Sequence, residues 1–171
     1  LEKNQELKSL LIQETPWLRD AQSETEQKKR IAMLFNLNKM KSEQETALNK
    51  LQQNQMSNGA WSWFAGGKEN RYITQHIVTG LGHLNKLTSA ENSRSQVQMT
   101  ENAIAYLDDA FVAEYEYMKK YAKNINDDHL SYTQVHYLYM RSFFPSIKTS
   151  KKVGEITAYY KGQIQKYWNA R

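Results

Sequence analysis

The stretch that most constrains this chain is residues 56–74, which separate two strongly helical halves. It contains two of the four tryptophans and three of the seven glycines. Glycine and asparagine tolerate positive φ, so two pairs within it indicate turns, Asn58-Gly59 and Gly66-Gly67. Between the turns lie three aromatic residues that are too apolar for a loop facing water, Trp61, Trp63 and Phe64. We therefore predict an aromatic and glycine-rich loop over 56–70 that folds back, its aromatic side chains packing against the ends of the flanking helices.

Helical periodicity runs through the rest of the chain. Apolar residues recur at three- and four-residue steps in seven segments, 2–13, 25–38, 42–55, 70–87, 96–123, 131–141 and 149–168. Three capping-box patterns mark helix starts, Ser23 to Glu26, Ser42 to Glu45 and Ser131 to Gln134. No strand alternation persists. The prediction is an all-α fold of six or seven helices in antiparallel pairs, in which 25–38 and 42–55 form a hairpin around a kink at 39–41.

Small residues predict where helices approach one another closely. Gly80 lies within the predicted helix 70–87 and would allow a neighbour to come near. In the last helix Gly154, Ala158 and Gly162 are four residues apart and share one face. A length of 171 residues is enough for one domain with a sizeable core, so we predict a single helical domain over 1–171.

Composition excludes several classes of function. The net charge of +5 is scattered along the chain, whereas a nucleic-acid-binding protein usually concentrates its charge on one face. The chain has no cysteine, which excludes disulfides, thiolate nucleophiles and cysteine-based metal sites. No apolar run approaches the roughly 20 residues of a membrane span, and no signal-peptide pattern is present. We therefore expect neither nucleic-acid binding nor direct membrane insertion.

No catalytic, cofactor or metal site is predicted. His76 and His83 are seven residues apart, too far for the i, i+4 pair of a helical metal site. Adjacent residues on a helix point about 100° apart, so neither Asp108-Asp109 nor Asp127-Asp128 presents two carboxyls to one substrate, and both pairs are interpreted as solvated. Gly66-Gly67-Lys68 lacks the spacing of a phosphate-binding loop. Tyrosine-rich helices after residue 131 could line a ligand groove, although tyrosine at helical spacing favours a core with hydroxyls at its rim.

Several motifs together resemble bacterial alpha-2-macroglobulin-like proteins. The most specific is the loop Asn58-Gly59-Ala60-Trp61-Ser62-Trp63-Phe64-Ala65-Gly66-Gly67 followed by Arg71-Tyr72-Ile73-Thr74-Gln75-His76-Ile77. Further similar stretches are Leu48 to Gln55, Ser23 to Ile31, His136-Tyr137-Leu138-Tyr139-Met140-Arg141-Ser142-Phe143-Phe144-Pro145, and Tyr159 to Trp168. The resemblance covers nearly the whole chain and is to a stretch of the thioester domain downstream of the thioester itself.

The resemblance implies a fold and a function. The fold is an α/α toroid, two concentric rings of helices shared with terpenoid cyclases and protein prenyltransferases, of which this chain would hold about half. Family members are large periplasmic or cell-envelope proteins, often lipid-anchored, that trap target proteases after cleavage of a bait segment. The chain is then a non-catalytic scaffold whose partners are the remaining domains of the parent protein. Its opening residues and the helical pattern at its end favour a piece of something longer, and exposed apolar faces predict self-association.

The chain departs from the family pattern at one important point. The thioester motif Cys-x-Glu-Gln is absent, and Ala60 stands where the family usually has a second glycine. No functional residue is carried over, and a loop-anchoring role is assigned to Gly59, Trp61, Trp63, Phe64, Gly66 and Gly67. Two alternatives remain open: a free-standing helical module that binds proteins or peptides, and an enzyme related to the isoprenoid-binding toroids, which would need clustered acidic metal ligands.

Overall fold

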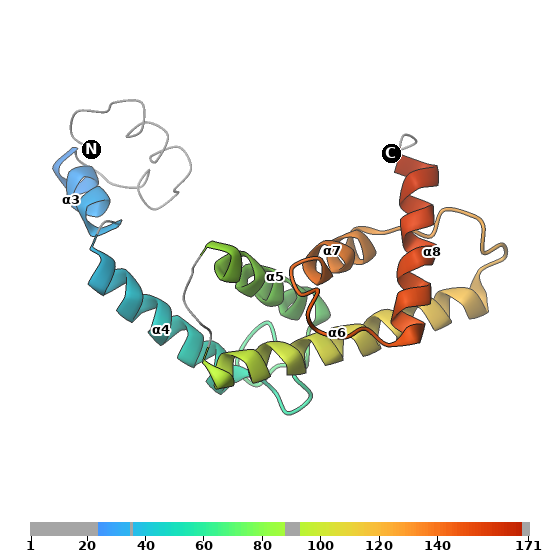
Figure 1. Cartoon of the computed structure of the whole chain (residues 1–171), viewed down its shortest axis with the longest axis horizontal. Coiled ribbons are helices and arrows are strands. Elements are labelled where there is room, and N and C mark those ends of the chain that lie inside the picture. The colour runs from blue at the N-terminus through green and yellow to red at the C-terminus, as the bar shows by residue number, and fades with distance from the viewer. Residues whose placement is uncertain (1–23, 35, 88–92, 169–171) are drawn as a thin grey trace. The chain divides into compact units, whose positions relative to one another are not determined.

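The computed structural model describes residues 24–34, 36–87 and 93–168. Over these residues the chain is all-helical, as predicted, with six helices and one isolated antiparallel bridge between Ser62 and Glu69 (Figure 1). The predicted helix 2–13 lies outside the described residues. The chain divides into two compact units, 1–50 and 51–171, each treated by itself below. The single domain predicted over 1–171 stays a prediction.

The first unit contains α3 (Glu24–Leu34) and most of α4 (Leu37–Asn54). The break between them lies near Asn36, whereas the sequence predicted it at 39–41, which is inside α4. The side-chain Oδ1 of Asn36 accepts a hydrogen bond from the backbone N–H of Lys39 at 3.2 Å. Asparagine is a favourable N-cap, so this residue starts α4, and the Ser42 to Glu45 pattern lies in mid-helix. The hairpin predicted for the two helices stays a prediction.

The second unit contains α5 (Arg71–Leu87), α6 (Arg94–Tyr121), α7 (Tyr132–Arg141) and α8 (Lys151–Tyr167). Serines cap three of them. At α6, the side chain of Ser93 accepts from Gln96 N, and at α8 the side chain of Ser150 accepts from Val153 N. At α7, the backbone N–H of Ser131 donates to the side chain of Gln134. The starts of α7 and α8 agree with the prediction within two residues. The Ser93–Gln96 capping box starts α6 at Arg94, two residues before the start predicted at 96.

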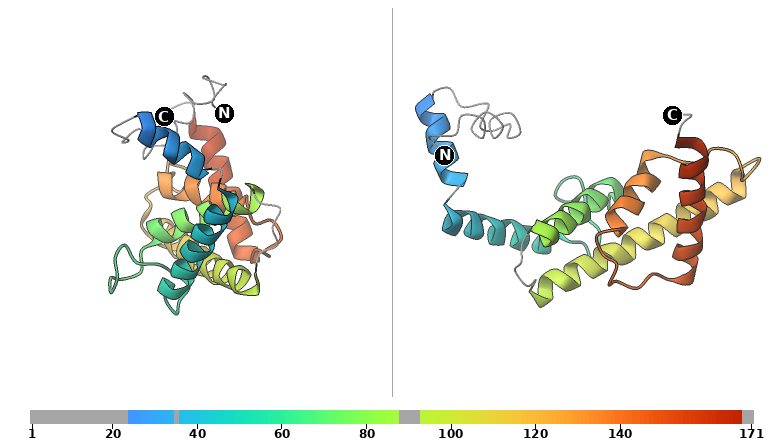
Figure 2. Two further views of the ribbon diagram at one scale, coloured as in Figure 1. Left: turned by 90° about the vertical axis from the view of Figure 1, so that its left-hand side faces the viewer. Right: turned by 45° about the horizontal axis from the view of Figure 1, so that its top comes forward.

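Helices α5 and α7 are parallel neighbours. Their contacts advance together along both helices: Gln75 with Thr133, Thr79 with His136, and His83 with Tyr139. Figure 1 and the right-hand view of Figure 2 show the two helices along the same side of α6. Helix α6 runs the opposite way to α7, because Glu114 contacts Gln134 whereas the earlier residue Asp108 contacts Arg141.

The core of the second unit lies where α6, α7 and α8 meet. Phe111 stacks on Tyr137 with ring centroids 3.9 Å apart and lies 5.4 Å from the ring of Tyr160. All three side chains are buried. Their burial fits the preference for tyrosine as core at helical spacing, whereas Tyr132 and Tyr139 are exposed. Burial of aromatic side chains of this size dominates the packing energy of such a core.

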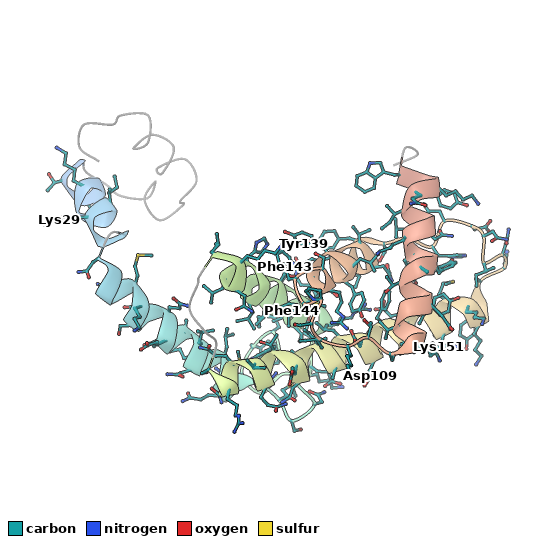
Figure 3. All side chains as sticks on the ribbon, viewed as in Figure 1. Lys29, Asp109, Tyr139, Phe143, Phe144 and Lys151 are labelled. Atoms are coloured by element: carbon teal, nitrogen blue, oxygen red, sulfur yellow. The ribbon has the colours of Figure 1, made fainter. Side chains whose placement is uncertain are left out.

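Close helix approach occurs at Gly82 rather than at the predicted Gly80. A Cβ at Gly82 would lie 2.6 Å from the Cβ of Phe143, whereas nothing lies within 4 Å of a Cβ at Gly80. Figure 3 shows Phe143 and Tyr139 between α5 and α7. Gly154 and Gly162 likewise have no neighbour within 4 Å, and their face of α8 is exposed among the described residues.

Candidate functional site: the aromatic loop

The aromatic loop, residues 56–70, begins with a tight turn that lies against α6. Met56 and Ala60 are joined by a backbone hydrogen bond of 2.9 Å, and Asn58 Oδ1 accepts from Ala60 N at 3.1 Å. Gly59 has φ +87°, and a Cβ there would be 2.3 Å from the carbonyl oxygen of Asn102. Glycine is therefore required twice at this position, for its backbone conformation and for its closeness to the α6 backbone.

Replacing Gly59 with alanine is expected to lower the free energy of unfolding by at least about 2 kcal/mol, since left-handed backbone strain adds to the clash with Asn102. Urea denaturation followed by circular dichroism measures the change. Gly80→Ala is the matched control: its Cβ meets nothing within 4 Å inside α5, and it is expected to stabilise by about 0.5 kcal/mol. Equal effects of the two substitutions would contradict this account of Gly59.

Trp61 anchors the loop. Its side chain is 3% exposed, and its Nε1–H donates to the carbonyl of Leu51 at 2.8 Å. That carbonyl belongs to the last turn of α4, where backbone oxygens have no partner within the helix. The Trp61 backbone N–H donates to Thr74 Oγ1 at 2.9 Å, and its carbonyl accepts from Asn70 N at 2.8 Å. One residue thus joins the end of α4 to the start of α5.

Gln55 is an anchor that the sequence analysis missed. Its Nε2 donates to the carbonyl of Gly59 at 2.9 Å and to that of Met99, in α6, at 2.8 Å. A glutamine just before a turn carries no local signal for this role, because Met99 is 44 residues away. Together, Gln55 and Trp61 connect the loop to α4, α5 and α6.

Trp63 and Phe64 differ from the expectation that they pack against helix ends. Their side chains are 66% and 68% exposed. They lie on a small turn closed by the Ser62–Glu69 bridge and by a 3.0 Å hydrogen bond from Gly67 N to Phe64 O. Gly66, with φ +78°, provides the left-handed residue that this turn needs. Of the three aromatic residues predicted as anchors, the described structure buries Trp61 alone, and the backbone turn points the other two outward.

The double substitution Trp63→Ser, Phe64→Ser is expected to change the free energy of unfolding by less than about 0.5 kcal/mol, because exposed side chains away from caps and cores contribute little. The same variant is expected to reduce any self-association of the chain, since it removes two adjacent exposed aromatic side chains. Chemical denaturation and size-exclusion chromatography with light scattering measure the two effects. A large loss of stability would mean that these side chains pack after all.

An ion pair lies beside the loop at the start of α5, between a nearly buried arginine and a glutamate whose side chain is 42% exposed. The guanidinium of Arg71 pairs with Glu114, whose other carboxylate oxygen accepts from Gln134 Nε2 at 3.0 Å. Burial, and next the negative charges of Tyr159 and Glu114, raise the pKa of Tyr160 to about 12. Glu114, Gln134 and Tyr160 lie in the wall of an open cleft of about 460 Å³ between α6, the start of α7 and α8, and none of the predicted loop residues lines it.

A largely buried ion pair holds α6 against α7. Asp108 accepts from the Tyr137 hydroxyl at 2.5 Å and from Arg141 Nη2 at 3.3 Å, and Arg141 also donates to the carbonyl of Ile147. Burial raises the pKa of the Asp108 carboxyl in spite of these donors. The prediction that Asp108 is solvated is therefore wrong, although Asp109 is exposed. The pair orients α7 and the loop that follows it, through the contact of Arg141 with Ile147.

The described residues contain no group of three or more histidine, aspartate or glutamate side chains placed to hold a metal ion. His76 contacts His136, His83 contacts Tyr139, and His129 Nε2 lies 2.8 Å from the carbonyl of Asn124. In the part of the chain described, none of the helices has both the length and the apolar character needed to cross a bilayer.

Comparison of the chain with models of known protein families, with curated proteins and with solved structures finds no match in any of the three. The macroglobulin resemblance thus depends on the sequence motifs themselves.

Proposed function

We propose that this chain is a non-catalytic helical segment of a bacterial alpha-2-macroglobulin-like protease inhibitor, where it supports the region around the thioester. The observation that carries the proposal is the loop motif. Three members of the motif, Gly59, Trp61 and Thr74, also anchor the loop to α5 and α6. A motif whose members act together in space is stronger support than a chance match of letters.

The arrangement of helices also supports the toroid part of the proposal. In two concentric rings, alternate helices run parallel within one ring, and the helices between them run the opposite way in the other. The parallel neighbours α5 and α7, with α6 opposed to α7, fit this order. The uncovered face of α8 at Gly154, Ala158 and Gly162 gives further helices of the ring a place to pack closely.

The proposal assigns the chain a structural role. It would hold the interfaces that rearrange after bait cleavage, with the remaining domains of the parent and, through them, the target proteases as partners. The parent would be a periplasmic or cell-envelope protein, held there by its lipid anchor. Because this chain has no cysteine, the thioester itself would come from elsewhere in the parent. No cofactor, nucleic acid or direct membrane insertion is part of the proposal.

The open reading frame that encodes this chain tests the proposal. We expect Cys-x-Glu-Gln within about a hundred residues upstream of Leu1, a spacing of the size of half a toroid domain. The full protein should then take up one methylamine and release one thiol, measured by mass spectrometry and thiol titration, and a Cys→Ser variant of that motif should do neither. Absence of both the motif and any protease trapping would overturn the proposal.

A helical module that binds proteins or peptides is the second candidate. The exposed side chains of Trp63 and Phe64 and the open cleft favour it, because solvent-exposed aromatic pairs are common in binding surfaces. The two candidates differ in what the full protein does to a protease. A trap changes the protease's access to large substrates, whereas a binding module leaves it unchanged.

A further inference from the structure

Two histidines face each other across the interface of α5 and α7. The ring centroids of His76 and His136 are 4.4 Å apart, with an angle of 63° between the ring planes. His136 is 8% exposed, whereas His76 is exposed. Tyr72 contacts the His76 ring at 4.1 Å, and Tyr132 contacts the His136 ring at 5.4 Å. The contact therefore places two groups that gain charge near neutral pH in one partly buried cluster.

Hydrogen bonds determine the protonation of His136. The hydroxyl of Thr79 donates its one proton to the carbonyl of Gln75, at 2.7 Å. Thr79 Oγ1 must then accept from His136 Nε2, 3.1 Å away, so the Nε2 atom carries the ring proton. The other ring nitrogen, Nδ1, is buried and has no hydrogen-bond partner among the described residues. A second proton would add a buried N–H donor with no acceptor, which is unfavourable.

The ring of His76 approaches that of His136 from α5. Its Nδ1 lies 2.9 Å from the carbonyl of Tyr72, an acceptor, so the Nδ1 atom carries the ring proton. Within the described residues, the one charge that shifts the pKa of His136 is that of His76.

We infer that the His76–His136 contact makes the α5–α7 interface acid-sensitive, so that protonation of His136, opposite the His76 ring, separates the helices along this contact. Burial, and next the charge of His76, lower the pKa of His136 below its ordinary 6.5. In the open interface the ring has its ordinary pKa and binds more protons below pH 6.5. Acidification therefore favours the open form. The effect grows as the pH falls from 6.5 and levels off below the lowered pKa of His136. This inference does not depend on the proposed function.

Amide hydrogen exchange of the full 171-residue chain, between about pH 7.5 and about pH 5 and corrected for the intrinsic exchange rate, measures the opening. One proton taken up on opening multiplies the open fraction by up to about tenfold per pH unit. We expect protection of α7 amides to fall with that slope below about pH 6.5. His136→Gln, whose amide can still donate to Thr79, should abolish the slope. His76→Gln, which removes the like charge, should reduce it.

His83→Gln is the matched control, since His83 lies in the same interface but its Nε2 is paired with the Tyr139 hydroxyl, and it should keep the wild-type slope. An unchanged slope in His136→Gln would overturn the inference. Should His136→Gln fail to fold, the ring protons of His136 in the wild-type chain, followed by NMR, decide instead. A titration midpoint of His136 below pH 6.5 supports the inference, and a midpoint at or above pH 6.5 overturns it.

Discussion

Replacing Trp61 with alanine is expected to lower the free energy of unfolding of this chain by about 4 kcal/mol, because a buried indole leaves a large cavity. The side chain is 3% exposed, and its Nε1–H is the partner of the Leu51 carbonyl at the end of α4. Truncation therefore removes packing and a helix-end hydrogen bond together. Guanidinium denaturation, followed by far-ultraviolet circular dichroism, measures the loss.

Two further variants separate the parts of this effect. Trp61→Phe keeps most of the buried surface and removes the N–H, so it should cost about 1 to 2 kcal/mol. Trp63→Ala alters an aromatic residue two positions away that is 66% exposed, and it should change stability by less than about 0.5 kcal/mol. If Trp61→Ala and Trp63→Ala had similar effects, Trp61 would not be the anchor of the loop.

Replacing Arg141 with methionine is expected to cost about 3 kcal/mol, because it leaves the Asp108 carboxylate buried without its cation. The side chains of Arg141 and Asp108 are 10% and 16% exposed, and both take part in hydrogen bonds across the α6–α7 interface. Burial already raises the pKa of Asp108 in the intact pair. The desolvation of the Asp108 carboxylate is thus a large cost that Arg141 only partly offsets. Removing Arg141 takes this compensation away.

The combined variant Asp108→Leu, Tyr137→Phe, Arg141→Met is expected to recover most of the stability that Arg141→Met alone loses. Replacing a buried ion pair by apolar side chains is often neutral or stabilising, and the Tyr137 hydroxyl must go with its acceptor. Thermal and chemical unfolding of the single and triple variants measure the recovery. A triple variant less stable than Arg141→Met would show that the pair contributes a net stabilisation.

Local signals predicted helices well and predicted their ends unevenly. Ser131 is where the capping pattern placed the start of α7. Ser42 shows the same kind of pattern in the middle of α4, because a serine three residues before a glutamate also fits an exposed helix face. Asn36 begins α4 instead, and no pattern of letters separates the two positions. Helical periodicity identifies the helix. Which candidate residue becomes its N-cap depends on the tertiary structure around the first backbone N–H groups.

Contacts between distant residues were beyond sequence reasoning. Trp61 and Trp63 look alike in the sequence, and only the positions of Leu51 and Thr74 decide which of them is buried. Asp108 was interpreted as solvated because its partner Arg141 is 33 residues away, on another helix. Close approach at Gly82 depends in the same way on where Phe143 lies. Such pairs arise from tertiary packing, which local propensity does not determine.

Protease trapping by the full-length parent protein is the most direct test of the proposed function. The parent is incubated with a protease, and cleavage of a large protein substrate is compared with cleavage of a small peptide substrate. The proposal predicts that the large substrate is protected while the small one is still cleaved, because a trapped protease keeps its active site but loses access to bulky substrates. Equal cleavage of both substrates, with and without the parent, would contradict it.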